Sequence, residues 1–187
     1  MRDEQDLIPA PLTAAAVRSY IDFDGHEHTS PDQPSLQARL QSEGVAALWH
    51  LLETNGFAYL ADEVGMGKTR ETMGVIATQF LRKPDSRVVI VCSSETLQRQ
   101  WQSEWAAFLQ TCYKLLEDRL LGSVDASQLE ILHKHETLRE FMASLRRGEA
   151  RIHLLRYSSF SWPVSLGDTD DLDTMLARYA HGAGLAG

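Results

Sequence analysis

The chain has 187 residues, of which 43% are apolar, enough for one domain with its own core and too many for a disordered chain. Its net charge of −8 excludes a simple basic nucleic-acid binder, although the charge is uneven: −8 over residues 1–64, +2 over 65–147 and −2 over 148–187. Cys92 and Cys112 form no metal-type pair, so we expect reduced thiols. Without a signal-like or membrane-spanning apolar stretch, a cytoplasmic protein with no membrane contact is expected.

Residues 1–34 are rich in Pro, Asp, His and Ser, which predicts an irregular acidic leader. Within it, four potential metal ligands stand at alternate positions: Asp22, Asp24, His26 and His28. A solvated hairpin ending at Gly25 is favoured over a metal site, because no further ligands are evident.

The next segments alternate between helical and strand-like patterns. Ser35 is placed to cap a helix that Asn55-Gly56 can end. FAYLA (57–61) is a continuous apolar run, which predicts a strand buried on both faces of a parallel sheet. Apolar residues at helical spacing then predict a helix over 68–82, before Pro84.

Two more strands and two more helices are expected beyond Pro84. RVVIVC (87–92) reads as a buried strand, and Ser93-Ser94 as the cap of a helix whose aromatic residues face the core: Trp101, Trp105 and Phe108. A helix is predicted around 129–146 and a strand at 151–157. This alternation predicts an α/β fold with a parallel sheet flanked by helices.

The sequence Gly67-Lys68-Thr69 stands between the FAYLA run and an amphipathic helix. Glycines let backbone N–H groups curl around an anion, and the helix N-terminus adds its positive dipole. The lysine would reach the β- and γ-phosphates of ATP, and the threonine hydroxyl would bind Mg²⁺. The match to G-x-x-x-x-G-K-[ST] is incomplete, since Asp62 replaces the first glycine.

Four segments in order resemble motifs of the Swi/Snf-type branch of superfamily-two helicases, and in particular its bacterial RNA-polymerase-associated, helicase-like members. LADEVGMGKTRE (60–71) resembles motif I, in which an Asp-Glu pair precedes the glycines, and SSETLQRQWQSEW (93–105) resembles motif Ia with a serine in place of proline. LQSEGVAAL (40–48) resembles the glutamine motif, and LLRYSSFS (154–161) resembles motif Ib.

The resemblance implies a P-loop NTPase RecA-like lobe over 35–161 that is incomplete at its C-terminus, followed by a polar tail over 162–187. It implies that Gln41 reads adenine and that Thr69 holds Mg²⁺. The phosphates of ATP would lie on Gly65, Met66, Gly67 and Lys68. The backbone of duplex DNA would be contacted by Ser94, Gln98 and Ser158.

Phosphoryl transfer also needs a second acidic group and an arginine. Four aspartates in the tail do not follow an apolar run and are rejected for this role: Asp168, Asp170, Asp171 and Asp173. The chain therefore resembles the opening part of a longer motor whose remainder, with a second lobe, would complete catalysis. Alone it is expected to bind nucleotide weakly and to hydrolyse it negligibly.

Two other functions stay open at this stage. One is a self-contained small-molecule kinase, which would need arginines that close over the phosphates: Arg139, Arg146 and Arg147 are the candidates. The other is a non-catalytic interaction module that docks through its acidic head. His133 and His135 are expected to be solvated residues at a helix start rather than a metal pair.

Overall fold

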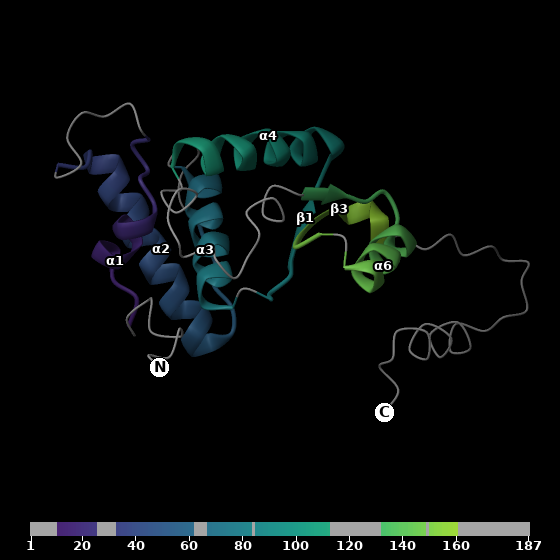
Figure 1. Ribbon diagram of the computed structural model, residues 1–187, viewed down its shortest axis with the longest axis horizontal. Helices are drawn as coiled ribbons and strands as arrows, with labels where there is room; N and C mark the ends of the chain where they lie inside the picture. Colours follow the sequence, from purple (N-terminus) through teal and green to yellow (C-terminus); the bar gives the residue numbers. More distant parts are fainter. Residues whose placement is uncertain are drawn as a thin grey trace, which may run out of the picture.

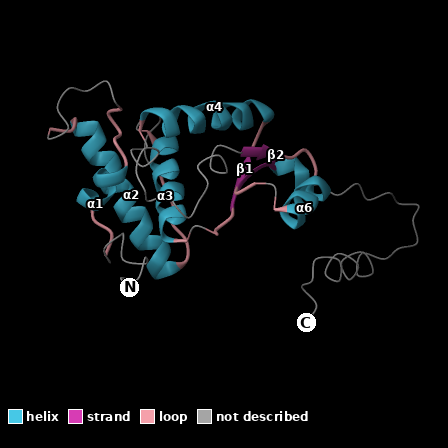
Figure 2. Cartoon of the chain, viewed as in Figure 1, coloured by secondary structure: helices cyan, strands magenta, loops and turns pink. Residues whose placement is uncertain are grey.

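The computed structural model describes residues 11–25, 33–61, 67–83, 85–112, 132–148 and 150–160. Three helices lie side by side at one end of the molecule, and a small sheet lies at the other end (Figure 1). The helices are α1 (Ala14–Tyr20), α2 (Leu36–Asn55) and α3 (Lys68–Arg82). A long helix, α4 (Glu95–Thr111), extends from the sheet across the top of α3 (Figure 2).

The boundaries of α2 and α3 agree with the sequence patterns. The Ser35 side chain accepts a hydrogen bond from the Ala38 N–H at the start of α2, and Gly56 ends that helix in the left-handed conformation, with φ 75°. α3 starts at Lys68 and ends at Arg82, as its apolar spacing predicts. Local capping chemistry is therefore sufficient to set both ends of α2.

The leader is more regular than predicted between residues 11 and 25. α1 begins at a Thr13 cap, and the side chains of Val17, Ile21 and Phe23 are buried in the same apolar cluster as α2 and α3. The Tyr20 hydroxyl lies 2.7 Å from Thr78 Oγ1 of α3, and burial raises the pKa of Tyr20 to about 12. The leader, which was expected to be partly irregular, thus contains one helix, in a stretch where no proline interrupts residues 12–25. The division into leader, lobe and tail stays a prediction.

The sheet is parallel, as the strand and helix alternation predicts. It contains β1 (Val88–Cys92), β2 (Leu132–Lys134) and β3 (Ile152–Arg156) in the order β1-β3-β2. Val88 and Leu132 both pair with Ile152, so the three strands start in register and end at one edge. A short 3-10 helix, Tyr157–Phe160, follows β3 at this edge.

Helices cover both faces of the central strand β3, whose residues 152–155 are all buried. Ile152 belongs to the core cluster that contains Trp105 and Phe108 of α4, as the aromatic spacing predicts. On the other face, the ring of His153 packs against Phe141 of α6 (Leu138–Arg147), with 5.2 Å between ring centroids. Ile152 and His153 are adjacent in sequence and point to opposite faces, which places α4 and α6 on opposite sides of the sheet.

The predicted strand at 57–61 does not form. These residues have no regular structure, and Phe57 and Tyr59 are 71% and 84% exposed. An apolar run becomes a strand only where another strand accepts and donates its backbone hydrogen bonds. Within the described residues, the sheet consists of β1, β3 and β2, and residues 57–61 pair with none of them.

The predicted helix at 129–146 is also wrong in its first part. Residues 132–134 form β2, and α6 begins only at Leu138, after a Thr137 cap. His133 and His135 are therefore on the same side of an extended segment, and His135 is buried with 5% exposure. The expectation of two solvated histidines at a helix start is thus wrong for His135.

Cys92 and Cys112 are both buried and free. Among the helices of the described residues, none has the length and apolar character required to cross a bilayer.

Candidate functional site

The start of α3 has the backbone that the phosphate-binding hypothesis requires. Gly67 is its N-cap residue in the left-handed conformation, with φ 88°, and no side chain caps the helix. The other α-helices of the described chain are capped by a hydroxyl: Thr13, Ser35, Ser94 and Thr137. An uncapped helix start directs its first N–H groups and its dipole toward whatever anion occupies the space before it.

Gln41 of α2 lies against Gly67. Its side chain is 2% exposed, and its amide Nε2 has no hydrogen-bond partner among the described residues. A Cβ atom placed on Gly67 would lie 2.0 Å from that nitrogen. The backbone angle therefore favours glycine here, and a larger residue would displace the end of the Gln41 side chain. A buried amide without a partner is costly, and a ligand with a hydrogen-bond acceptor would relieve that cost.

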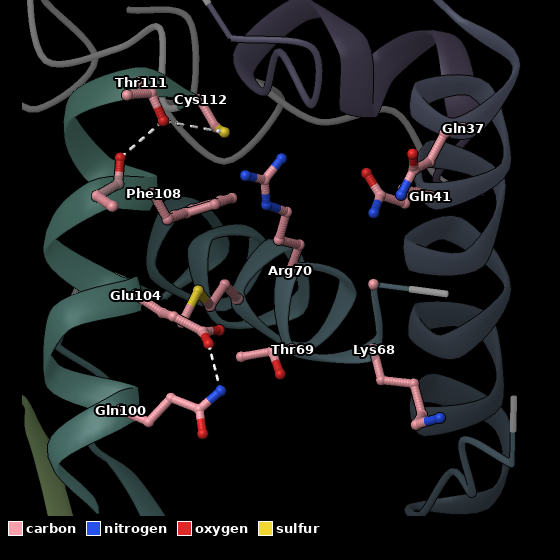
Figure 3. Close-up of a pocket in the computed structure, with 13 residues that line it drawn as sticks. Gln37, Gln41, Lys68, Thr69, Arg70, Gln100, Glu104, Phe108, Thr111 and Cys112 are labelled. Carbon is pink, nitrogen blue, oxygen red and sulfur yellow. Dashed lines mark hydrogen bonds between the residues drawn. The ribbon is translucent and has the colours of Figure 1, made fainter. Parts of the chain in front are cut away.

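A cavity of 640 Å³ opens at this point between α2, α3 and α4. Gln37 and Gln41 line it from α2, Lys68 and Thr69 from the start of α3, and α4 closes the far side (Figure 3). The α4 residues on that side are Gln100, Glu104, Ala107, Phe108 and Thr111. The volume is in the range of small-molecule sites in general. The predicted nucleotide-site residues that share this one cavity are Gln41, Gly67, Lys68 and Thr69.

Gly65 and Met66, the other two predicted phosphate-loop residues, lie outside the described residues. The same holds for His26 and His28 of the potential metal set, and for the four tail aspartates. Within the described residues, no three His, Cys, Asp or Glu side chains are grouped in a way that could hold a metal ion. Asp24 instead accepts hydrogen bonds from the backbone N–H and the hydroxyl of Ser35.

Close helix packing holds α3 in place behind the cavity. A Cβ on Gly44 of α2 would lie 2.9 Å from the carboxylate carbon of Glu71, and one on Gly74 of α3 would lie 2.6 Å from Val45 Cγ2. The two glycines thus let α2 and α3 approach closely, with the Glu71 carboxylate buried between them. Sequence reasoning missed this pair, although a glycine in the middle of each predicted helix was a signal for close packing.

Arg70 was also missed. It lines the cavity next to Thr69, and its Nη1 donates a hydrogen bond to the Phe23 carbonyl oxygen at 3.2 Å. The Asp22 N–H donates to the Cys112 carbonyl oxygen at 2.7 Å. Residues 22–23 therefore connect the start of α3 to the end of α4, on either side of the cavity.

The predicted nucleic-acid contacts divide into two groups. Ser94 and Ser158 are exposed and follow β1 and β3 at the edge where the parallel strands end. Gln98 is fully buried, and its Nε2 donates to the Leu154 carbonyl oxygen of β3 at 3.3 Å. Gln98 therefore links α4 to β3, beneath the surface that the two serines present.

Arg156 is a residue of this edge that sequence reasoning missed. It ends the central strand opposite Cys92, and the Ser159 hydroxyl accepts a hydrogen bond from its backbone N–H. Its side-chain Nε is buried and has no hydrogen-bond partner in the described part of the chain. Arg156 therefore adds a positively charged residue to the end of the strand that Ser158 follows.

The comparisons with known proteins agree with these motifs. The SNF2-related domain family matches residues 40–145, more than half of the chain. No solved structure gives a significant match.

Three curated relatives illustrate the similarity. Switch 2 of Arabidopsis thaliana is 28% identical over 117 residues, which are 52% of this chain and 14% of the relative. The RNA polymerase-associated protein RapA of Pectobacterium atrosepticum is 46% identical over 59 residues, 32% of this chain and 6% of the relative. RapA of Serratia proteamaculans is 35% identical over 99 residues, 51% of this chain and 10% of the relative.

The matches thus span 6 to 14% of the length of these relatives. The match of the family over more than half of the chain agrees with the parallel α/β fold and with the order of the four motifs. The chain belongs to the SNF2-related domain family of helicase-like ATPases.

Proposed function

We propose that this chain is the ATP-binding part of a Swi/Snf-type, DNA-dependent ATPase that translocates on duplex DNA. One observation carries the proposal: the uncapped start of α3 and the unpartnered amide of Gln41 meet at Gly67 in a single cavity. The first feature suits an anion and the second suits a hydrogen-bonding base, and ATP has both. Mg²⁺ is the expected partner of the phosphates.

Each residue of the cavity then has a separate task. The backbone from Gly65 to Gly67 and the ammonium group of Lys68 would hold the phosphates, and the Thr69 hydroxyl would bind Mg²⁺. Gln41 would recognise adenine. When bound, Mg²⁺ would neutralise charge on the β- and γ-phosphates. The residues of this chain would orient the nucleotide and exclude water from one side of it.

The DNA backbone would lie along the edge where the strands end. Ser94 and Ser158 present hydroxyl groups there, and such contacts position a duplex without reading its sequence. Gln98 is not part of this proposal as a direct contact, because it is buried against β3. A cytoplasmic location belongs to the same proposal.

Hydrolysis would need groups from elsewhere in the full-length protein. Of the described residues that line the cavity, Glu104 supplies a carboxylate, and its Oε1 accepts a hydrogen bond from Gln100 Nε2 at 2.6 Å. It lies on a helix rather than at the end of an apolar strand, and Arg70 is engaged with Phe23. We therefore infer that the chain alone binds nucleotide but hydrolyses it negligibly.

No specific observation favours the alternatives. The kinase hypothesis requires arginines over the phosphates, but Arg139 and Arg147 line a different cavity, between β2 and α6. The hypothesis of a non-catalytic module makes no use of the cavity at Gly67.

The test is ATP turnover by the full-length protein, measured with and without duplex DNA. We expect turnover that DNA stimulates and that Lys68→Ala abolishes, while Lys83→Ala, at the other end of α3, leaves it unchanged. Turnover that is the same without DNA would contradict the assignment to DNA-dependent ATPases. Phosphate transfer to a nucleoside or sugar by residues 1–187 alone would favour the kinase.

A further inference from the structure

Two polar side chains that line the nucleotide cavity have no task in the proposed function: Gln37 and Arg70. Gln37 stands four residues before Gln41, so the two glutamines share one face of α2. Arg70 belongs to the first turn of α3. In Figure 3 the Arg70 guanidinium lies in the same part of the view as the two glutamine amides, whereas the side chains of Lys68 and Thr69 point the other way. The cavity therefore has a polar region apart from the residues proposed to hold the phosphates.

The polar side chains on the α4 wall of the cavity are bonded within their own helix. Gln100 Nε2 donates a hydrogen bond to Glu104 Oε1 at 2.6 Å, and Thr111 Oγ1 donates one to the Ala107 carbonyl oxygen at 2.8 Å. These groups are less available to a ligand than the exposed amide and guanidinium on the opposite wall.

The backbone before α2 holds Arg70 in place. Its Nη1 donates to the Phe23 carbonyl oxygen at 3.2 Å, and the Phe23 side chain is buried. The Asp22 N–H donates to the Cys112 carbonyl oxygen, which fixes the same segment to the end of α4. A guanidinium has several N–H groups, so one such bond leaves others for a ligand. Because Arg70 is already oriented, it loses less conformational entropy when it binds one.

The part of ATP that the proposed function leaves without a contact is the ribose. Its 2′- and 3′-hydroxyl groups lie on the face of the sugar opposite to the base and to the 5′-carbon that carries the phosphates. Gln41 lies against Gly67, so the base and the phosphates would both be bound close to this glycine. Gln37 lies one helical turn further along α2, about 6 Å from Gln41. The hydroxyl groups would therefore point toward Gln37 and Arg70.

The two side chains also suit a pair of hydroxyl groups chemically. A hydroxyl both donates and accepts hydrogen bonds, a guanidinium only donates, and an amide does both through separate atoms. Arg70 would donate to the hydroxyl oxygens, and the side-chain carbonyl oxygen of Gln37 would accept a hydrogen bond from a hydroxyl.

We propose that Gln37 and Arg70 bind the ribose hydroxyls of ATP and make the site selective for ribonucleotides. This inference rests on the proposed function, since it assigns residues to a further part of the same nucleotide. Gln41 would select the base and this pair would select the sugar, so the two preferences are separable by mutation.

The test measures the affinity of the full-length protein for ATP and for 2′,3′-dideoxy-ATP, which lacks both hydroxyl groups, in the presence of Mg²⁺. Gln37→Ala combined with Arg70→Gln removes the proposed contacts. Arg39→Gln is the control, because Arg39 is an exposed residue of α2 that does not line the cavity. A thermal melt checks that each variant is folded.

We expect the wild-type protein to bind ATP at least about ten-fold more tightly than the dideoxy nucleotide, as for the loss of a hydrogen bond to a charged group. The double variant should bind the two nucleotides about equally, and Arg39→Gln should keep the wild-type ratio. Gln41→Ala should also keep the ratio of ATP to dideoxy-ATP while it loses the preference for adenine.

Equal affinities in the wild-type protein, or a wild-type ratio in the double variant, would overturn this inference. So would a double variant that weakens both nucleotides by the same factor, since these residues would then act on the fold or on the total charge. In each of these cases, weaker nucleotide binding in Lys68→Ala leaves the proposed function standing. Nucleotide binding that neither Lys68→Ala nor Gln41→Ala changes would overturn both.

Discussion

Gly67 has a backbone angle that favours glycine and a contact with Gln41 that a larger residue would disturb. An L-residue in the left-handed conformation costs about 1–2 kcal/mol, and at this position the new Cβ would also displace the Gln41 amide. We expect Gly67→Ala to weaken nucleotide binding at least ten-fold and to lower the melting temperature. Both are measurable with a fluorescent ATP analogue and a thermal melt.

Gly56 is the matched control for this prediction. It has nearly the same backbone angle, with φ 75°, but no atom lies within 4 Å of its ideal Cβ position. Gly56→Ala should lower stability by the backbone cost alone and leave nucleotide binding intact. Equal effects of the two substitutions on binding would show that the contact with Gln41 does not matter.

His153 makes stability depend on pH. It is completely buried, its Nδ1 lies 3.0 Å from His135 Nε2, and burial is the main cause that lowers its pKa to about 4, with the nearby His135, His133 and Arg87 as smaller causes. Between pH 6.5 and 4 the unfolded chain takes up a proton that the folded chain does not. As the pH is lowered through this window, the free energy of unfolding should therefore fall by about 1.4 kcal/mol for each pH unit.

The measurement is urea unfolding at several pH values between 4 and 7. His153→Phe keeps a ring beside Phe141 and should flatten the pH dependence relative to wild type, whatever its effect on absolute stability. The exposed His50→Gln serves as control and should keep the wild-type slope. An unchanged slope in His153→Phe would assign the pH dependence to other groups.

At the scale of elements, Ser94 has one established role and one proposed role. Its hydroxyl accepts a hydrogen bond from the Leu97 N–H and caps α4, and it is also proposed to contact DNA. Ser94→Ala should cost about 1 kcal/mol of stability, whereas Ser94→Asp should keep the cap and repel phosphate. Thermal melts and DNA titrations of both variants separate the two roles.

The expected result is that Ser94→Asp is the more stable variant and the weaker DNA binder. Thr13→Ala, which removes the cap of α1 away from the strand ends, should lower stability without changing DNA affinity. If DNA affinity falls in proportion to the loss of stability in all of these variants, Ser94 acts only as the cap of α4 and does not contact DNA.

Elements whose ends depend on local chemistry could be predicted from the sequence. Ser35 and Gly56 define α2, and Gly148 ends α6 in the left-handed conformation with φ 66°. The local sequence could not show whether residues 57–61 form a strand. A strand depends on pairing partners that can lie anywhere in the chain. β2 has only three residues. A segment of that length is too short for the spacing of its apolar residues to distinguish a strand from a helix.

The proposed nucleotide site could be recognised in the sequence for a similar reason. Gly67, Lys68 and Thr69 are contiguous, so their chemistry is visible in one short motif. The burial of Gln98 and the link from Arg70 to Phe23 join residues that are distant in sequence, 56 and 47 positions apart. No spacing rule predicts such contacts, which form only when the helices have packed.

At the scale of the whole molecule, one face of the described sheet is exposed at β1. Val89 and Val91 point to the face that α6 covers over β3, yet they are 43% and 51% exposed. β1 is also an edge strand within the described sheet. Parallel sheets are normally covered on both faces, and an exposed apolar edge promotes association.

We therefore expect the 187-residue chain to self-associate with rising concentration, and Val91→Lys to suppress this without lowering the melting temperature. Sedimentation velocity over a range of protein concentrations measures this self-association. Leu36→Lys, which alters a residue 70% exposed at the start of α2, is the control and should leave association unchanged. A chain that stays monomeric at high concentration would show that the exposed valines are tolerated.

The most direct measurement is the affinity of the full-length protein for ATP and GTP in the presence of Mg²⁺, before and after changes at the cavity. We expect ATP to bind more tightly than GTP, Lys68→Ala to weaken both nucleotides at least ten-fold, and Gln41→Ala to remove the preference for adenine. Lys83→Ala should change neither affinity. Nucleotide binding that is unaffected by Lys68→Ala and Gln41→Ala would contradict the assignment of the cavity at Gly67 as the ATP site.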